Sequence, residues 1–166
     1  MQRAHAYQLS KVVSFAMALG ITLACKKIKC DEPAPTLKYD TLMLDESREN
    51  LIFKTAFEDC QGDIGHLGAV DSNTIRSVRT YLYERVGGEW KRWYPANLAD
   101  TSSFFSIIPA SKKNREGWLL KGTVVQEFPL VQLYQGRDTI RFETYIIDQA
   151  GNKSNRVQSV PYIFQL

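Results

Sequence analysis

The sequence predicts an all-β protein, an antiparallel β-sandwich of about seven strands preceded by a signal helix and a flexible linker. Three observations lead to this prediction. Apolar residues alternate with polar ones in several short segments, turn-forming residues separate those segments, and no stretch beyond residue 24 keeps helical spacing for more than about two turns. With 44% hydrophobic and 11% aromatic residues, the chain can also form a substantial core.

The first 24 residues form a leader of a different character. Residues 12–24 are apolar except for one serine, one glycine and one threonine, and the charged side chains of the leader are Arg3 and Lys11. Such a run is too short to cross a hydrocarbon core of ~30 Å, which takes about 20 residues. Its length and flanking charge are typical of a secretory signal peptide.

The end of the leader, Thr22, Leu23, Ala24 and Cys25, resembles a bacterial lipobox. In that family the cysteine thiol is joined to diacylglycerol, and the new amino terminus usually carries a further acyl chain such as palmitate. The family prefers leucine where this chain has Thr22. The resemblance implies that Cys25 is the lipidated mature terminus and holds the protein on a membrane of the cell envelope, as an outer membrane lipoprotein. The alternative is an ordinary signal peptide with a free cysteine near the cut.

The domain organisation follows from the leader and from the strand pattern. We expect a lipoprotein signal peptide at 1–24, a lipid-anchored linker at 25–45 and a β-sandwich at 46–166. Prolines 33 and 35 favour an extended tether. Lysines come before the acidic residues after Cys25, so a periplasmic and a surface-facing location both stay open.

Charge and cysteine content exclude some classes of function. Removal of 24 residues from the 166 leaves 142, and removal of the two leader charges from the 21 basic residues leaves 19 against 18 acidic ones. A nearly neutral chain without charge blocks disfavours nucleic acid as a partner. With Cys25 lipidated, Cys30 and Cys60 either pair in an oxidising compartment or stay as two thiols, and no thiolate metal site is expected.

Seven segments have strand character, and we expect strands near 51–58, 75–85, 90–94, 104–108, 118–128, 139–148 and 156–164. In the segment 51–58, residues 51, 53, 55 and 57 share the buried face. In the segment 139–148, which has the clearest alternation, residues 140, 142, 144 and 146 face one way, and residues 141, 143 and 145 face the other way. Gly87 and Gly88 suit a type I′ or II′ turn. Gly122 indicates a bulge or bend, and Pro161 indicates an edge strand.

Two loops carry a second resemblance. Residues 57–65 (FEDCQGDIG) and 147–155 (IDQAGNKSN) are similar to a pattern in small, mostly uncharacterised Bacteroidota lipoproteins, which read Asp-x-Asp-Gly-Asp-Ile-Gly and Asp-x-Ala-Gly-Asn-x-Ser-Asn. The second loop also resembles the last hairpin of bacterial immunoglobulin-like and fibronectin III-like modules. The resemblance covers about residues 46–166 and implies an immunoglobulin-like sandwich without specifying a function.

The residue types in these loops suit tight turns held by side chain to backbone bonds. The expected structural turn residues are Asp59, Gly62, Asp63, Gly65, Asp148, Gly151, Asn152 and Asn155. The alternative is a calcium site at Asp59 and Asp63, with Glu58 as a further ligand, because calcium prefers several oxygen ligands. We expect the structural role, with no metal and no cofactor.

Catalysis is the least favoured function. His66 is the one histidine beyond the leader, and no nucleophile, zinc or phosphate-binding motif is present. A non-catalytic binding or assembly role is favoured, because aromatic residues are dense in the hairpin around Gly87. A row of exposed rings there would stack on a glycan or contact a protein. The candidate surface consists of Tyr81, Tyr83, Trp90, Trp93 and Tyr94. The alternatives are a carbohydrate-binding surface lipoprotein and a passive spacer with these rings buried.

Overall fold

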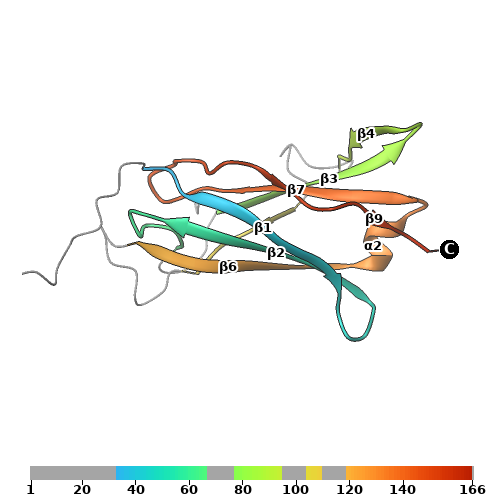
Figure 1. Ribbon diagram of the computed structural model, residues 1–166, viewed down its shortest axis with the longest axis horizontal. Helices are drawn as coiled ribbons and strands as arrows, with labels where there is room; N and C mark the ends of the chain where they lie inside the picture. Colours follow the sequence, from blue (N-terminus) through green and yellow to red (C-terminus); the bar gives the residue numbers. More distant parts are fainter. Residues whose placement is uncertain (1–32, 67–76, 95–103, 110–118, 166) are drawn as a thin grey trace, which may run out of the picture.

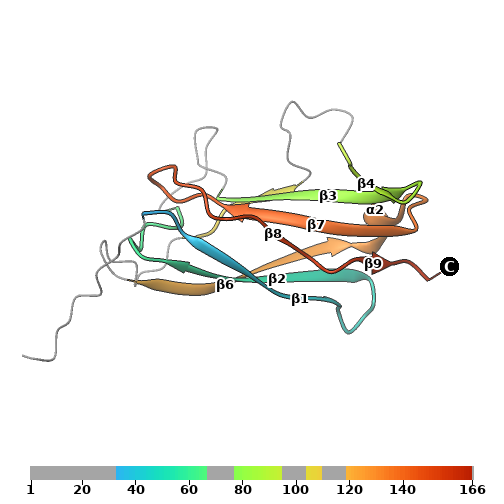
Figure 2. The same cartoon turned by 45° about the horizontal axis from the view of Figure 1, so that its top comes forward.

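The computed structural model describes residues 33–66, 77–94, 104–109 and 119–165, and it confirms the all-β prediction (Figure 1). Two antiparallel sheets face each other as the two layers of a sandwich, which Figure 2 shows most clearly. Each of the seven expected segments contains a strand. The expected signal peptide, with Cys25 and Cys30, lies outside the described residues.

The first sheet has the order β1-β2-β6 and contains β1 (Thr36–Leu44), β2 (Asn50–Asp59) and β6 (Leu120–Pro129). The second sheet has the order β4-β3-β7-β8, with β5 paired to β3 and β9 paired to β7. It contains β3 (Val78–Val86), β4 (Glu89–Arg92), β5 (Phe104–Ser106), β7 (Thr139–Ile146), β8 (Val157–Gln158) and β9 (Tyr162–Ile163).

Strand β1 corrects the predicted linker, because residues 36–44 pair with β2 along their whole length. The register shifts between Tyr39 and Thr41, so that Asp40 is an extra residue in the strand. This bulge places Leu37 and Tyr39, and beyond it Leu42 and Leu44, toward the core. The interruption breaks the period-two alternation that would identify the strand in the sequence.

Three stacked phenylalanines from both sheets form the centre of the core. Phe142 of β7 lies 5.6 Å from Phe53 of β2 and 4.5 Å from Phe128 of β6, measured between ring centres. All three side chains are buried. The expected alternation of β2 and β7 is confirmed, since residues 51, 53, 55 and 57 and residues 140, 142, 144 and 146 are all buried.

Gly122 has a role different from the predicted bulge. Its strand, β6, pairs with β2 without a shift in register, and Gly122 lies opposite Phe57. A Cβ atom at this position would come within 2.6 Å of Cε1 of the Phe57 ring. The glycine therefore makes room for a buried ring, and the prediction of a bulge is wrong.

Two connections complete the fold. Gly87 and Gly88 have φ values of 61° and 86°, which confirms the tight hairpin turn between β3 and β4. A helical turn that the sequence did not predict, α2 (Leu130–Tyr134), buries Leu133 at one end of the sandwich (Figure 1). The last expected strand is divided into β8 and β9, with Pro161 between them.

Candidate binding face

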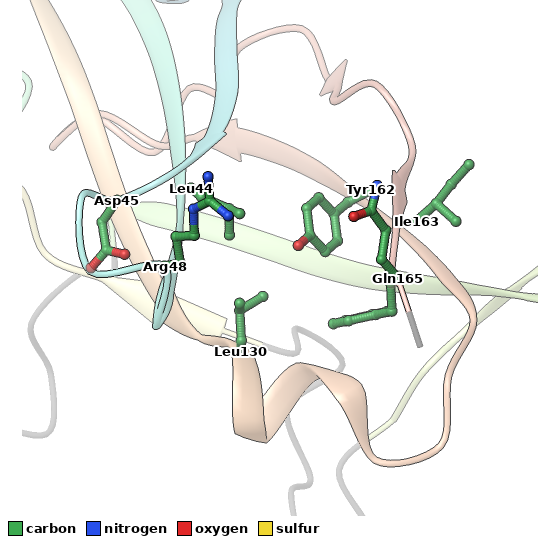
Figure 3. Close-up of a pocket in the computed structure, with 8 residues that line it drawn as sticks. Leu44, Asp45, Arg48, Leu130, Tyr162, Ile163 and Gln165 are labelled. Atoms are coloured by element: carbon green, nitrogen blue, oxygen red, sulfur yellow. The ribbon is translucent and has the colours of Figure 1, made fainter.

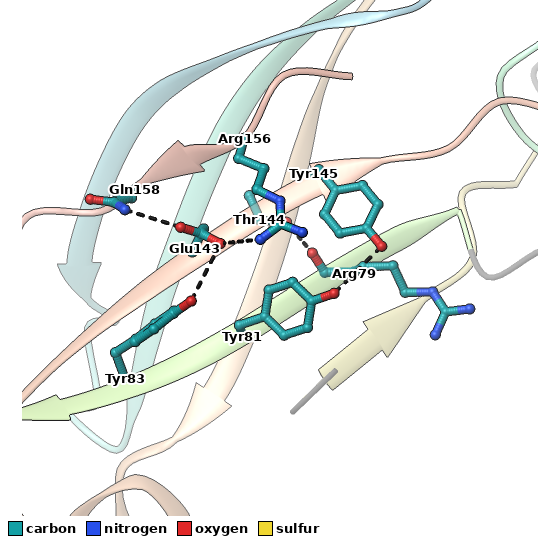
Figure 4. A network of polar contacts seen from close by, with 8 residues as sticks. All are labelled: Arg79, Tyr81, Tyr83, Glu143, Thr144, Tyr145, Arg156 and Gln158. Atoms are coloured by element: carbon teal, nitrogen blue, oxygen red, sulfur yellow. Dashed lines mark hydrogen bonds and ion pairs between the residues drawn. The ribbon is translucent and has the colours of Figure 1, made fainter. Parts of the chain in front are cut away.

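The outer face of the second sheet gathers arginine and aromatic side chains. Val78, Thr80 and Leu82 of β3 point into the core, so Arg79, Tyr81, Tyr83 and Arg85, which alternate with them, point outward. The pairing of β4, β7 and β8 continues this face across the sheet. We call it the arginine–tyrosine face, and it consists of Arg79, Tyr81, Tyr83, Arg85, Trp90, Arg92, Arg141, Glu143, Tyr145, Arg156 and Gln158. Figure 4 shows the part of this face around Glu143.

In the register of the second sheet, arginines on one strand lie opposite aromatic residues on the next strand. Tyr83 lies opposite Arg92 on one side and opposite Arg141 on the other, and Tyr145 lies opposite Arg79. Cross-strand neighbours of this kind are in contact distance. Each cation therefore has an aromatic neighbour on the adjacent strand.

The guanidinium groups lie over the rings at cation–π distances. Arg92 is 3.7 Å from the ring centre of Tyr81, and Arg141 is 4.5 Å from that of Trp90. Arg156 is 5.4 Å from Tyr81 and 5.3 Å from the ring of Tyr145. Such contacts fix both partners, because the ring quadrupole attracts the cation and the ring plane orients it.

Glu143 is the one carboxylate of this face and is 8% exposed. It accepts hydrogen bonds from Arg156 at 2.8 Å, Gln158 at 3.0 Å and the Tyr83 hydroxyl at 3.5 Å (Figure 4). Burial opposes ionisation, but the hydrogen bonds from Gln158 and Arg156 and the charge of Arg156 outweigh it and lower the pKa of Glu143. The face therefore carries a net positive charge, since it contains five arginines and one glutamate.

The tyrosine hydroxyls respond to the same surroundings. The hydroxyls of Tyr81 and Tyr145 lie 3.5 Å apart. Burial and the neighbouring Tyr81 hydroxyl raise the pKa of Tyr145. The pKa of Tyr81 is lowered. Burial alone would raise it, but the contacts with Tyr145 and Arg92 outweigh burial.

The structure corrects the predicted row of exposed rings. Tyr81 is only 5% exposed, and Tyr83 and Trp90 are half-buried beneath arginines. Trp93 packs against the main core, with its ring 6.5 Å from that of Phe104. Of the five candidate residues, Tyr94 alone is largely exposed, at 58%. The arginines were not predicted, although Arg79 and Arg85 flank Tyr81 and Tyr83 at every second position of the strand.

The two loops singled out in the sequence are held by their aspartates. Asp59 is fully buried and accepts hydrogen bonds from the backbone N–H groups of Gln61 and Ile64, at 3.1 and 2.9 Å. Asp148 accepts two from Asn152, from the backbone N–H at 2.7 Å and the side-chain amide at 2.8 Å. Both aspartates thus hold their turns by hydrogen bonds, and Gly62, Gly65 and Gly151 have the positive φ angles that tight turns require.

Asp63 lies close to both of these aspartates. Burial raises the pKa of Asp63, and the negative charges of Asp148 and Asp59 raise it further. Backbone hydrogen bonds from Asp63 itself and from Ala150 oppose this rise in the pKa without cancelling it. Within the described ranges, no group of three or more histidine, cysteine or acidic residues is arranged to hold a metal ion.

Asn155 has a partner that the sequence did not indicate. Its side-chain amide donates to the carbonyl of Leu37 and its oxygen accepts from the Leu37 N–H, both at 2.8 Å. The predicted role was to cap neighbouring amides. The structure shows instead that Asn155 binds the edge of β1, 118 residues away.

His66 and Cys60 flank the first loop. The backbone N–H of His66 donates to the carbonyl of Ile108 at 2.8 Å. Cys60 is disulfide-bonded, and its partner lies outside the described residues, where the sequence places Cys25 and Cys30.

Comparison with known proteins found no family model, no curated protein and no solved structure that matches the chain. In the part of the chain that the structure describes, no helix is long and apolar enough to cross a membrane.

Replacing Glu143 by glutamine is expected to change how stability depends on pH. Because the folded-state pKa lies below the ordinary value of 4.5, the ionised carboxylate stabilises the fold above that value, and this contribution is lost as the pH falls through the folded-state pKa. Glu143→Gln should therefore melt below the wild type at pH 7, and the two melting temperatures should converge in acid. A difference in melting temperature that stays constant from neutral pH to about pH 3 would contradict the lowered pKa of Glu143.

Proposed function

We propose that the protein is a membrane-anchored lipoprotein of the cell envelope, and that its sandwich, of immunoglobulin-like type, is a non-catalytic binding module. The observation that carries the proposal is the arginine–tyrosine face. Its cations lie on β3, β4 and β7 and directly before β8, and ring contacts hold Arg92, Arg141 and Arg156 in place. A surface with side chains already ordered loses little conformational entropy when a partner binds.

The charge of the face favours an anionic partner. Strands in a sheet lie about 4.8 Å apart, so an extended polyanion that crosses β8, β7, β3 and β4 would meet a guanidinium on each strand. The faces of Tyr81 and Trp90 are already covered by arginines, which leaves little ring surface for stacking on neutral sugars. We therefore propose an acidic polysaccharide as the partner of this surface.

The leader supports the anchor, and the disulfide supports export of the chain. Residues 22–25 resemble a lipobox, and a disulfide at Cys60 is typical of a chain in an oxidising compartment. Mass spectrometry of the native amino terminus tests the anchor. We expect an acylated Cys25, and an unmodified terminus at any other residue would remove the lipid from the proposal.

A glycan array with matched variants tests the binding face. The variant Arg85→Gln/Arg156→Gln removes two exposed cations of the face, and Lys38→Gln/Lys54→Gln removes two cations from the outer face of the first sheet. We expect the wild type to capture acidic glycans in preference to neutral ones, and the arginine variant to bind at least tenfold more weakly, while the lysine variant binds like the wild type. Added salt should weaken capture, because the contacts are ionic.

Two results would contradict this function. Equal capture of acidic glycans by the arginine and lysine variants would show that the face is not the binding surface. No capture of any acidic glycan by the folded wild type would favour the passive spacer.

A further inference from the structure

A pocket of about 680 Å³ opens at one end of the sandwich, and none of its lining residues belongs to the arginine–tyrosine face (Figure 3). It lies between the β1–β2 turn, the start of α2 and the last residues of the described chain. Its size is within the range of about 300–1,000 Å³ that is usual for small-molecule sites. The lining residues are Leu44, Asp45, Arg48, Leu130, Tyr162, Ile163, Phe164 and Gln165.

The apolar part of this pocket is held in place from three sides. Leu44, Leu130, Tyr162 and Phe164 are half-buried and pack against the main core. The ring of Tyr162 meets that of Phe164 edge to face, at 5.1 Å between centres. Backbone hydrogen bonds tie Leu130 to the carbonyl of Glu49 and Phe164 to the carbonyl of Asp138, at 2.8 and 2.9 Å. The apolar surface is therefore formed before any ligand arrives.

Arg48 stands at the edge of the pocket in a strained backbone conformation. Its φ angle is 58°, a left-handed conformation that costs a residue other than glycine about 1 kcal/mol or more. The β1–β2 turn maintains this conformation through Asp45. The Asp45 carboxylate accepts from the Glu49 N–H, from both the N–H and the side-chain amide of Asn50, and from the Ser47 hydroxyl, at 2.8–3.2 Å.

In the described part of the chain, the guanidinium of Arg48 has no partner. Among the described residues, no hydrogen bond, ion pair or ring contact engages it. The nearest lining carboxylate, Asp45, has its acceptor positions filled by the turn and lies on the side of Arg48 away from Tyr162 in Figure 3. An exposed cation with five N–H donors thus stands beside a preformed apolar surface.

We propose that this pocket binds a carboxylate attached to an apolar group. The planar guanidinium of Arg48 pairs with the two carboxylate oxygens, and the apolar group lies on Leu44, Leu130 and Tyr162. A free alkyl carboxylate and the C-terminal carboxylate of a peptide with an apolar last residue share this chemistry. The site is separate from the arginine–tyrosine face and does not depend on the function proposed for it.

Calorimetric titration of the purified full chain tests the site with two pairs of probes. Sodium octanoate is compared with octanamide, and a tetrapeptide that ends in leucine with a free carboxylate is compared with its C-terminal amide. We expect at least one carboxylate probe to bind, and to bind at least tenfold more tightly than its amide. Binding of octanoate alone identifies a small-molecule site, and binding of the peptide identifies a site for chain ends.

Arg48→Asn is the decisive variant, because asparagine tolerates the left-handed conformation and removes the charge. We expect it to fold, with a melting temperature no lower than that of the wild type, and to bind the carboxylate probe at least tenfold more weakly. Lys54→Asn, which removes a cation outside the pocket, should bind like the wild type. The proposal fails if neither carboxylate binds, if the amides bind equally well, or if Arg48→Asn binds as tightly as the wild type.

Discussion

Replacing Phe142 by alanine is expected to lower the free energy of unfolding by about 3–5 kcal/mol, a large fraction of the stability of a domain of this size. Phe142 is fully buried in β7 and stacks on Phe53 and Phe128 of the opposite sheet. Its ring also meets Phe104 edge to face, at 6.4 Å between centres. Removal of the ring therefore leaves a cavity between the two layers that the surrounding strands cannot close without changing their pairing.

Phe105→Ala is the matched control for this prediction. Phe105 lies opposite Arg79 on the outer side of the second sheet and is 45% exposed. We expect its replacement to cost about 1 kcal/mol or less. Urea unfolding of both variants measures the difference, and a loss of less than 1 kcal/mol for Phe142→Ala would show that the two sheets do not pack as described.

Reduction of the disulfide at Cys60 is expected to cost about 2–5 kcal/mol of folding free energy. The bridge ties the start of the first loop, directly after β2, to a cysteine earlier in the chain. Reduction frees the unfolded chain from this link and so favours unfolding. Thermal melts with and without dithiothreitol should therefore differ by well over 5 °C.

Serine variants decide which cysteine is the partner. If Cys25 carries the lipid, Cys30 must be the partner, so Cys30→Ser should melt like the reduced wild type and should not respond to dithiothreitol. Cys25→Ser should keep the full response to reduction. The reverse pattern would place Cys25 in the bridge and would exclude it as the lipid attachment site.

Local sequence pattern predicted those strands that have one buried and one outward face. The alternation in β2 and β7 identified their buried residues correctly, because each strand contributes every second side chain to the core. The pattern failed in β1, where the bulge at Asp40 shifts the alternation by one residue. It also failed for α2, since five residues are too few to show helical spacing.

The sequence indicated where the aromatic residues of the candidate site lie, but it did not indicate that arginines cover them. The aromatic residues do belong to the β3–β4 hairpin and its surroundings, as the sequence indicated. Their burial depends on Arg92, Arg141 and Arg156, and the last two lie more than 40 residues further along the chain. Contacts between strands that are distant in sequence, like that of Asn155 with Leu37, leave no local pattern to recognise.

Arginine footprinting tests the central claim, that the outer face of the second sheet is the binding surface. Phenylglyoxal modification of the exposed arginines is measured by mass spectrometry with and without a captured acidic glycan. Arg85 and Arg156 lie on the face, whereas Arg48 lies at the pocket and serves as the internal control. We expect the glycan to protect Arg85 and Arg156 from modification at least fivefold and to leave the modification of Arg48 unchanged. Equal modification of all three arginines in the presence of bound glycan would contradict it.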